Sequence, residues 1–241
     1  MKITVIIAAG GLSSRMAGKN KLLEKIGGKP LLVRTTGVFL GMEEISGVII
    51  VAAKKWMDEY SQALEQEDML DRVRITEGGK NRTESVYYGL LDADKDTDIV
   101  LVHDAARPLV TEKIIRDCIE GAIEHGACCA AVPLTDTLKE SNGRGFVKRT
   151  LERDRLFRIQ TPQAFIYKDI LKLHKKAALR GLGVSDDAQI AEYFGYHIYL
   201  VESDFSNIKI TTQEDLVVAE ALLSSRDDAG AHDSLAPADI G

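Results

Sequence analysis

A short loop near the start of the sequence combines glycines with cations, the residue types that hold phosphate groups. Residues 8–21 follow an apolar run and contain Gly10, Gly11, Arg15 and Lys21. Paired glycines let backbone N–H groups approach a polyanion, and arginine offers a bidentate fork to phosphate oxygens. We therefore expect a phosphate-binding loop here; the alternative is a plain turn whose cations face solvent.

Two common phosphate motifs do not fit this loop. A P-loop has four residues between its first glycine and a Gly-Lys-Ser/Thr triplet, whereas six residues separate Gly11 from Gly18 and Asn20 follows Lys19. The Gly-x-Gly-x-x-Gly spacing of dinucleotide-binding proteins is also absent from the loop. The spacing indicates a protein other than a P-loop ATPase or an ordinary dehydrogenase.

A second segment, residues 76–85, again runs from a predicted strand through a glycine pair to the start of a predicted helix. Gly78 and Gly79 could bring the backbone against a planar base or a sugar, and Ser85 would lie in the first turns of the helix. A glycine pair before a capped helix is more often just a turn, so this signal is weak by itself.

A third segment, residues 102–108, ends a predicted strand in Asp104, two alanines and Arg107. A carboxylate at the carboxyl end of a strand is well placed to hold Mg²⁺ directly or through water. The alternative is an Asp104–Arg107 ion pair that braces a turn. His103 alternates to the opposite face from Asp104, so we interpret it as a structural histidine rather than a base.

Three weaker signals lie further along the chain. Lys209 belongs to a predicted strand over 207–211, and it gains interest only if that strand borders the site. A Thr-Pro pair predicts a tight loop that could hold Thr161 and Gln163. Residues 185–187 are typical of a helix cap with two acids.

Strand-like and helical patterns alternate along the chain to about residue 224. Near-continuous Val, Ile and Leu content suits strands buried on both faces of a parallel sheet. We therefore expect an α/β fold with a doubly wound, mostly parallel sheet and ligands at the carboxyl ends of its strands. Predicted strands cover 3–8, 47–53, 73–76, 98–103 and 127–133. Predicted helices cover 30–41, 55–66, 82–93, 111–125, 167–180, 187–194 and 212–224.

Residues 134–160 interrupt this alternation. Two short strand-like runs flank a Ser-Asn-Gly-Arg-Gly turn, which predicts a β-hairpin inserted at about 136–158. A hairpin with little core of its own tends to pack on another subunit, so we predict a dimerisation arm; a solvated hairpin is the alternative. We expect one domain over 1–225 and a disordered tail over 226–241.

The composition is that of an ordinary globular protein. Of 241 residues, 45% are hydrophobic, and a net charge of −6 argues against nucleic acid as the main ligand. No apolar run approaches the roughly 20 residues that span a bilayer, and we expect no signal peptide. Cys118, Cys128 and Cys129 lack the spacing of a zinc site or a disulfide frame, so we expect buried thiols in a reducing cytoplasm.

Together these motifs resemble the 2-C-methyl-D-erythritol 4-phosphate cytidylyltransferases of the non-mevalonate isoprenoid pathway. The resemblance spans roughly residues 2–223 and rests on motifs that occur in order along the chain. They are Ala-Ala-Gly with a following Arg-Met, Gly-Gly-x-x-Arg-x-x-Ser-Val at 78–86, His-Asp-Ala-Ala-Arg-Pro at 103–108, Asp-Thr-x-Lys at 136–139, Thr-Pro-Gln at 161–163 and Asn-Ile-Lys-Ile-Thr at 207–211.

The resemblance implies a Rossmann-like nucleotidyltransferase with CTP as co-substrate, Mg²⁺ near Asp104, and a homodimer. In such enzymes the 4-phosphate of methylerythritol attacks the α-phosphate of CTP, and pyrophosphate leaves. The resemblance implies that the transition state is stabilised by three cations, Arg15, Lys21 and Lys209. It implies that CTP is bound by Ala8, Ala9, Gly10, Gly11, Gly78, Gly79, Ser85 and Ala105. It implies that methylerythritol phosphate is contacted by Asp104, Arg107, Thr137, Arg153, Thr161 and Ser185. Of these, Thr137 and Arg153 would be supplied by the partner's arm.

Three other functions fit parts of the same pattern. A ribitol 5-phosphate cytidylyltransferase would share the chemistry and much of the scaffold. Nucleotidyltransferases of the molybdenum cofactor resemble mainly the first loop, in which Arg15 lies one residue further from Gly10 than in the usual methylerythritol pattern. A non-catalytic nucleotide-binding regulator would not need Lys21 and Lys209 together, since mere binding does not require cations on both sides of the α-phosphate.

Overall fold

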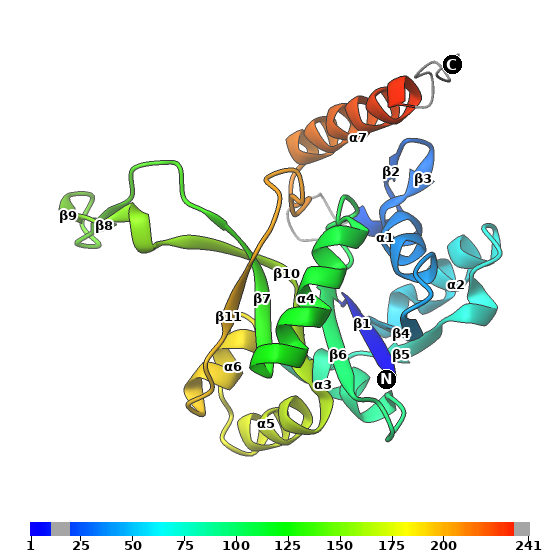
Figure 1. The fold of residues 1–241 in the computed structure, drawn as a ribbon, viewed down its shortest axis with the longest axis horizontal. Coiled ribbons are helices and arrows are strands. Elements are labelled where there is room, and N and C mark those ends of the chain that lie inside the picture. Colours follow the sequence, from blue (N-terminus) through cyan, green and yellow to red (C-terminus); the bar gives the residue numbers. More distant parts are fainter. Residues whose placement is uncertain (11–19, 234–241) are drawn as a thin grey trace, which may run out of the picture.

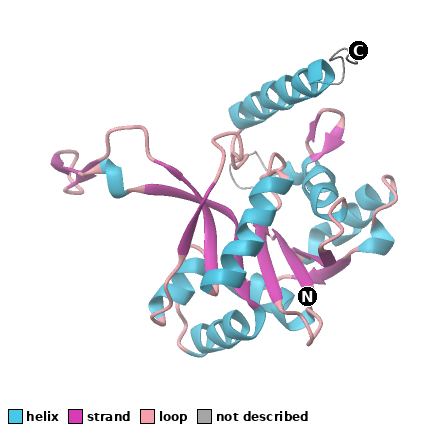
Figure 2. Cartoon of the chain, in the orientation of Figure 1, coloured by secondary structure: helices cyan, strands magenta, loops and turns pink. Residues whose placement is uncertain are grey.

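The computed structural model describes residues 1–10 and 20–233, with side chains described up to residue 226. A seven-stranded sheet forms its centre, and helices cover both faces of the sheet (Figures 1 and 2). The strands of this sheet are β1 (Ile3–Ala9), β4 (Ile45–Ala52), β5 (Arg74–Glu77), β6 (Ile99–Asp104), β7 (Ala127–Pro133), β10 (Phe157–Ile166) and β11 (Tyr199–Glu202). Their order across the sheet is β11-β7-β10-β6-β1-β4-β5.

The direction in which strands are added to the sheet reverses at β1. The chain passes from β1 to β4 and β5 on one side, and β6 then pairs with the other side of β1. Neighbouring strands are parallel except at β10, which runs antiparallel to both β6 and β7. A reversal of this kind opens a crevice at the carboxyl ends of the strands. The predicted doubly wound, mostly parallel α/β sheet is confirmed.

The helices agree closely with the segments predicted from periodicity. Each predicted helix is present, and most ends differ by one or two residues. The helices are α1 (Leu31–Leu40), α2 (Met57–Glu65), α3 (Arg82–Asp92), α4 (Glu112–His125), α5 (Tyr167–Leu179), α6 (Asp187–Tyr193) and α7 (Gln213–Asp233). The short 3₁₀ helices are η1 (Lys21–Leu23), η2 (Lys54–Trp56), η3 (Leu70–Arg72) and η4 (Arg153–Arg155).

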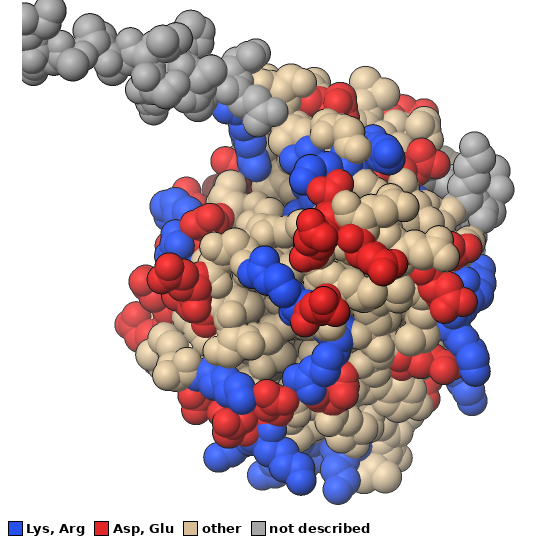
Figure 3. Space-filling model, turned by 90° about the vertical axis from the view of Figure 1, so that its right-hand side faces the viewer, with Lys and Arg blue, Asp and Glu red and all other residues tan. Residues whose placement is uncertain are grey.

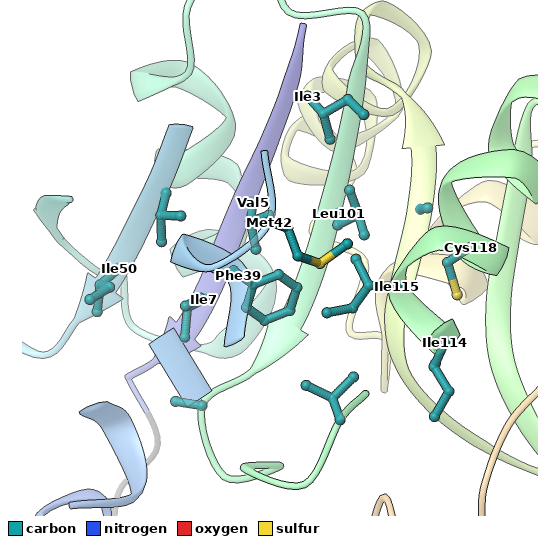
Figure 4. Packing of buried hydrophobic residues seen from close by; sticks show 14 of the residues in the cluster. Ile3, Val5, Ile7, Phe39, Met42, Ile50, Leu101, Ile114, Ile115 and Cys118 are labelled. Carbon is teal, nitrogen blue, oxygen red and sulfur yellow. The ribbon is translucent and has the colours of Figure 1, made fainter. Parts of the chain in front are cut away.

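Two hydrophobic layers hold the helices on the sheet. Successive side chains of a strand point to opposite faces, so Val5 and Ile7 of β1 face α1, α2 and α4. Figure 4 shows this layer, in which Phe39 of α1 and Ile115 of α4 lie over the strands. Ile6 points to the other face, which α3, α5 and α6 cover. The crevice at the strand ends is therefore set in a sheet that is buried on both faces.

The tight loop predicted around Thr161 and Gln163 is wrong, because both residues lie inside β10. The peptide bond between Thr161 and Pro162 is cis, and the pairing with β7 shifts register between Ile159 and Gln163. This strand could not be recognised from apolar patterns because several of its side chains are polar. Gln160, Thr161 and Gln163 are nonetheless all buried, and they find hydrogen-bond partners only in the tertiary structure.

The strand predicted over 207–211 is also wrong, since this segment is irregular and links β11 to α7. Tertiary contacts fix its path. The Ile210 N–H donates to the Ala106 carbonyl oxygen (2.8 Å), and the buried Asn207 side chain donates to the Thr161 carbonyl oxygen (3.0 Å). β11 itself was not predicted, although residues 198–201 form a short apolar run; only Val201 of its residues is buried.

The predicted hairpin is present and extends away from the body of the protein (Figure 1). β8 (Lys139–Ser141) pairs antiparallel with β9 (Val147–Thr150), and η4 follows. Phe146 and Val147 at this hairpin are 72% and 62% exposed. Aromatic and β-branched side chains so exposed on a projecting element favour contact with another subunit.

The last helix is longer than the predicted 212–224. α7 runs to Asp233, so the predicted disordered tail is helical over 226–233. Leu223 packs in a small cluster with Ile26 of the hairpin β2 (Lys25–Ile26) and β3 (Lys29–Pro30). Arg226 then donates to the Leu109 carbonyl oxygen (2.9 Å), which ties the helix beyond Ser224 to the body.

The three cysteines are buried, as expected from the sequence, and the surface is mixed in charge. Cys118, Cys128 and Cys129 are free and buried. Acidic and basic side chains are interspersed on the face shown in Figure 3. Within residues 1–10 and 20–233, no helix is long and apolar enough to cross a membrane.

Candidate active site

A pocket of about 270 Å³ opens at the crevice between the carboxyl ends of β1 and β6. Segments that are far apart in the sequence meet here, and they include the first loop, the 76–85 segment and the 102–108 segment. Asp104 and Ala8 are paired across β6 and β1, so their positions are fixed by the sheet. The lining includes Ala8, Gly10, Lys21, Gly79, Arg82, Ser85, Asp104, Ala106 and Lys209.

A second pocket of about 170 Å³ adjoins the first. The two share Arg82, Asp104 and Lys209, which therefore form a common wall. Four residues predicted to contact a second substrate line the adjoining pocket, namely Asp104, Arg107, Thr161 and Ser185. The other two do not line either pocket as the described residues form it: Thr137 and Arg153 lie on the exposed hairpin.

The common wall is built around the carboxylate of Asp104, which is 8% exposed. Lys209 Nζ lies 2.8 Å from Asp104 Oδ2, Arg107 Nε 3.7 Å from the same oxygen, and Arg82 Nε 3.6 Å from Oδ1. Burial opposes ionisation of Asp104, but the charge of Lys209, followed by those of Arg82 and Arg107, holds its pKa well below the usual range. The carboxylate is therefore ionised at neutral pH.

Two of the lysines that line the first pocket, Lys21 and Lys209, depend on the irregular segment over 207–211. Lys21 Nζ donates to the Ile210 carbonyl oxygen (3.0 Å), while Lys209 comes from this segment itself. Arg107 Nη1 donates to the Asn207 carbonyl oxygen (2.8 Å), which fastens the segment to the end of β6. Lys209 therefore borders the site, which is the condition for its predicted role.

Gly78 and Gly79 are required by close packing against the start of α3. A Cβ atom at Gly78 would lie 2.8 Å from Ser85 Oγ, and one at Gly79 would lie 2.3 Å from Glu84 Cγ. The Gly79 N–H donates to Ser85 Oγ (3.0 Å), and that hydroxyl donates to the Asn81 carbonyl oxygen (2.8 Å). A side chain at Gly78 would displace Ser85 of the pocket wall, and one at Gly79 would displace Glu84 beside it.

A profile of the 2-C-methyl-D-erythritol 4-phosphate cytidylyltransferase family matches residues 3–225. The chain belongs to this family. A 2-C-methyl-D-erythritol 4-phosphate cytidylyltransferase from Geobacillus thermodenitrificans is 39% identical over 94% of this chain and 99% of its own length. One from Caldanaerobacter subterraneus is 41% identical over 92% of this chain and 99% of its own. The resemblance seen in the sequence motifs is thereby confirmed.

Solved structures of this cytidylyltransferase family share the fold. The 4-diphosphocytidyl-2C-methyl-D-erythritol synthase from Anaerococcus prevotii superposes with a TM-score of 0.81 and 32% identity, over 92% of this chain and 96% of that one. The 2-C-methyl-D-erythritol 4-phosphate cytidylyltransferase from Thermus thermophilus gives a TM-score of 0.77 and 31% identity, over 93% and 100% of the two chains. The nucleotidyltransferase fold expected from the sequence is confirmed.

Of the residues expected to bind CTP or to act on it, some lie outside the described residues and others do not line the two pockets. Gly11 and Arg15 lie outside the described residues. Ala105 is completely buried, and its neighbour Ala106 lines the pocket instead. Ala9 is also buried and does not line either pocket as the described residues form it. Small residues here make room by packing under the pocket rather than by facing it.

Sequence reasoning missed Arg82 and Asp187, which carry the network behind the common wall. Arg82 Nη1 lies 2.7 Å from Asp187 Oδ2. A signal for Arg82 exists in its place within the Gly-Gly-x-x-Arg motif, but its partner is not readable from spacing. Asp187 looks like part of a helix cap, whereas the capping side chain is Asp186, which accepts the Gln189 N–H (2.9 Å).

The cytidylyltransferase resemblance implies Mg²⁺, and Asp104 fits that ion only as one ligand among several. No group of three or more His, Cys, Asp and Glu side chains within the described residues could form a metal cage. Mg²⁺ is commonly held by one or two carboxylates together with water and substrate phosphates. A single ionised carboxylate at the pocket wall suits a Mg²⁺ that arrives with a nucleotide.

His103 is confirmed as a structural histidine on the side of β6 away from the pockets. It is completely buried, and its Nε2 contacts the Arg107 carbonyl oxygen (3.1 Å), so Nε2 must be the protonated nitrogen. Nδ1 then accepts from the Thr161 hydroxyl (3.0 Å), which itself accepts the Asp104 N–H (3.0 Å). The neutral imidazole thus helps to fix the backbone at Asp104.

This buried imidazole predicts a pH-dependent stability. Burial lowers the pKa of His103 from 6.5 to about 4, so between these values the unfolded chain takes up a proton that the folded chain does not. Stability from this group is complete above pH 6.5 and is lost as the pH falls toward 4, by about 1.4 kcal/mol per pH unit. Urea unfolding should show a shallower decline in His103→Gln than in the wild type.

The control for this measurement is His125→Gln, which changes a partly exposed histidine at the end of α4. This variant should keep the wild-type decline in unfolding free energy. Equal slopes for the wild type and His103→Gln between pH 6.5 and 4 would show that His103 is not held neutral by the fold.

Proposed function

We propose that this chain transfers CMP from CTP to 2-C-methyl-D-erythritol 4-phosphate in the two joined pockets, and that pyrophosphate is released. The observation that carries the proposal is the common wall of Arg82, Asp104 and Lys209. Two ligands bound on either side of this wall would bring their phosphates together. Holding two reactants in this way removes much of the entropic barrier to their reaction.

In this reaction an oxygen of the acceptor phosphate attacks the α-phosphorus of CTP in line. A new phosphorus–oxygen bond forms, and the bond from the α-phosphorus to the bridging oxygen of the pyrophosphate breaks. Lys21, Lys209 and Arg15 would stabilise the negative charge on the oxygens around phosphorus in the transition state. The support for this assignment is that Lys21 and Lys209 line one pocket.

The nucleotide would occupy the first pocket, with its base and ribose near Gly79 and Ser85 and its phosphates over Gly10. Ala8, Ala9, Gly11, Gly78 and Ala105 would shape this side of the site. Gly10 lines the pocket just after β1, and its lack of a side chain lets phosphate oxygens approach the backbone there. The methylerythritol phosphate would occupy the second pocket and contact Arg107, Thr161, Ser185 and the wall at Asp104.

A Mg²⁺ ion would be held by the Asp104 carboxylate and by phosphate oxygens of the nucleotide. When bound, such an ion neutralises phosphate charge and makes the α-phosphorus easier to attack. Asp104 already has Lys209 as a partner at 2.8 Å. Lys209 can therefore shift from the carboxylate to an incoming phosphate oxygen while the carboxylate keeps a cation.

We further propose a homodimer in which the arm of one chain completes the site of the other. Thr137 and Arg153 lie on the arm and do not line the pockets of their own chain as the described residues form them. Exposed Phe146 and Val147 give the arm an apolar surface for a partner. The three free, buried cysteines support a reducing, cytoplasmic setting for the dimer.

The substrate is tested by incubating the purified protein with CTP, Mg²⁺ and an acceptor and measuring released pyrophosphate. We expect turnover with methylerythritol 4-phosphate and much less with ribitol 5-phosphate. Turnover with ribitol 5-phosphate alone would overturn the substrate assignment. Binding of CTP without turnover of either acceptor would instead identify a nucleotide-binding regulator.

The shared site is tested by mixing two inactive variants. Lys21→Ala removes a cation of the first pocket, and Arg153→Ala changes the arm, so each homodimer should lose activity, roughly 10²–10³-fold for the lysine. A mixed dimer has one site free of both changes. An equal mixture should therefore recover about a quarter of wild-type activity, because half of the dimers are mixed and each has one intact site of two.

The control for this mixture combines Lys21→Ala with Lys209→Ala, two changes in the same chain's pocket. Every site in these mixed dimers carries one of the two changes, so activity should stay low. Failure of the Lys21→Ala and Arg153→Ala mixture to recover, with mixed dimers verified by mass, would contradict a site shared between subunits.

A further inference from the structure

Asp187 is a fully buried carboxylate (0% exposed) at the start of α6 that contacts three other elements. Its Oδ2 lies 2.7 Å from Arg82 Nη1 of α3. Its Oδ1 accepts from His174 Nε2 of α5 (3.1 Å). Its own N–H donates to Gln163 Oε1 of β10 (3.1 Å). A single residue thus joins three helices and the antiparallel strand.

The contacts of Asp187 continue to the common wall through Arg82. Arg82 places its Nε 3.6 Å from Asp104 Oδ1 while its Nη1 contacts Asp187. His174, Asp187, Arg82 and Asp104 therefore form a continuous chain of polar groups. His174 and Asp187 are fully buried, and neither lines the first or the second pocket, whereas Arg82 and Asp104 line both.

Burying this carboxylate carries a desolvation cost that packing alone does not require. Replacing a buried ion pair by apolar residues of similar size is often neutral or stabilising, whereas removing one partner is strongly destabilising. The arrangement instead fixes the guanidinium of Arg82, since two carboxylates hold it from both sides. An arginine held in this way presents its charge to the pockets in one orientation.

We propose that Asp187, oriented by His174, is a positioning residue that fixes Arg82 and thereby the Asp104 carboxylate between the two substrates. The proposal rests on the reaction proposed above and adds residues that do not touch either substrate. Arg82 is the residue through which they act. Asp187 acts through its negative charge, which lies beside Arg82, and through Oδ1, which accepts from His174.

Binding of the acceptor phosphate in the second pocket should depend on this network more than binding of CTP in the first pocket. Ser185 and Asp186, which precede Asp187 directly, line the second pocket. The nucleotide side at Gly79 and Ser85 is held by hydrogen bonds of its own to the start of α3. Loss of the charge at Asp187 should therefore disturb the binding and positioning of the acceptor phosphate before it disturbs CTP.

The test is Asp187→Asn, which keeps the size of the side chain and removes its charge. We expect kcat/KM for methylerythritol 4-phosphate to fall about tenfold or more, since a charge-assisted contact to Arg82 is weakened. The Kd for CTP, measured by calorimetry, should change less than about threefold. Arg82→Lys should lower kcat/KM for the acceptor in the same way. The double variant should have a kcat/KM little lower than that of Arg82→Lys alone.

Tyr167→Phe is the matched control for general destabilisation. The Tyr167 hydroxyl donates to the Leu90 carbonyl oxygen (2.9 Å), a buried bond that also joins α5 to α3. Loss of this hydrogen bond should lower the free energy of unfolding and leave kcat, KM for the acceptor and the Kd for CTP unchanged. An effect of Asp187→Asn that matches Tyr167→Phe would reduce Asp187 to a structural role.

A second pair of variants keeps the proposal testable if Asp187→Asn does not fold. His174→Gln retains an N–H donor for Asp187, whereas His174→Leu does not. Acceptor kcat/KM should fall more in His174→Leu than in His174→Gln, with CTP binding retained in both.

Three outcomes would overturn the proposal: wild-type acceptor kinetics in folded Asp187→Asn, equal losses for CTP and acceptor, or effects of Asp187→Asn and Arg82→Lys that multiply in the double variant. Absence of turnover by the wild type would be a failure of the proposed function instead. The two failures are therefore distinguishable in the same set of measurements.

Discussion

The Asp104 carboxylate can stay ionised in its buried position only because Lys209, Arg107 and Arg82 surround it. These cations come from three separate parts of the chain: the irregular segment before α7, the turn after β6, and the start of α3. Because each must reach the same two oxygens, the carboxylate draws those parts into one wall. Both pockets share this wall, so their relative position depends on it.

The topology of the sheet explains why this carboxylate lies where ligands bind. β1 and β6 are neighbours whose connections leave in opposite directions, and their carboxyl ends are therefore not covered by a crossover. Asp104 ends β6 opposite Ala8 of β1. On the other side of β6, antiparallel β10 brings Thr161 to within hydrogen-bond distance of both the Asp104 N–H and His103. Strand pairing thus sets the height of the carboxylate in the crevice.

The buried parallel strands could be predicted from the sequence because continuous apolar runs such as 3–8 and 98–103 mark them. β10 could not, because Gln160 and Gln163 are polar yet buried, and only the folded structure supplies their partners. In the site, the strand-end position of Asp104 was readable from its apolar strand. Its contacts with Lys209 and Arg82 were not, because they join segments that are separated in the sequence by other elements and that no periodicity connects.

The most direct measurement of the central role of this carboxylate is the rate of pyrophosphate release by Asp104→Asn, together with its affinity for CTP. The asparagine keeps the shape of the side chain but cannot balance the three cations. We expect a rate at least about 100-fold lower than wild type, with CTP still bound because the surrounding cations remain. A rate near wild type would contradict a central role for this carboxylate, because the wall between the two substrates would then not need its charge.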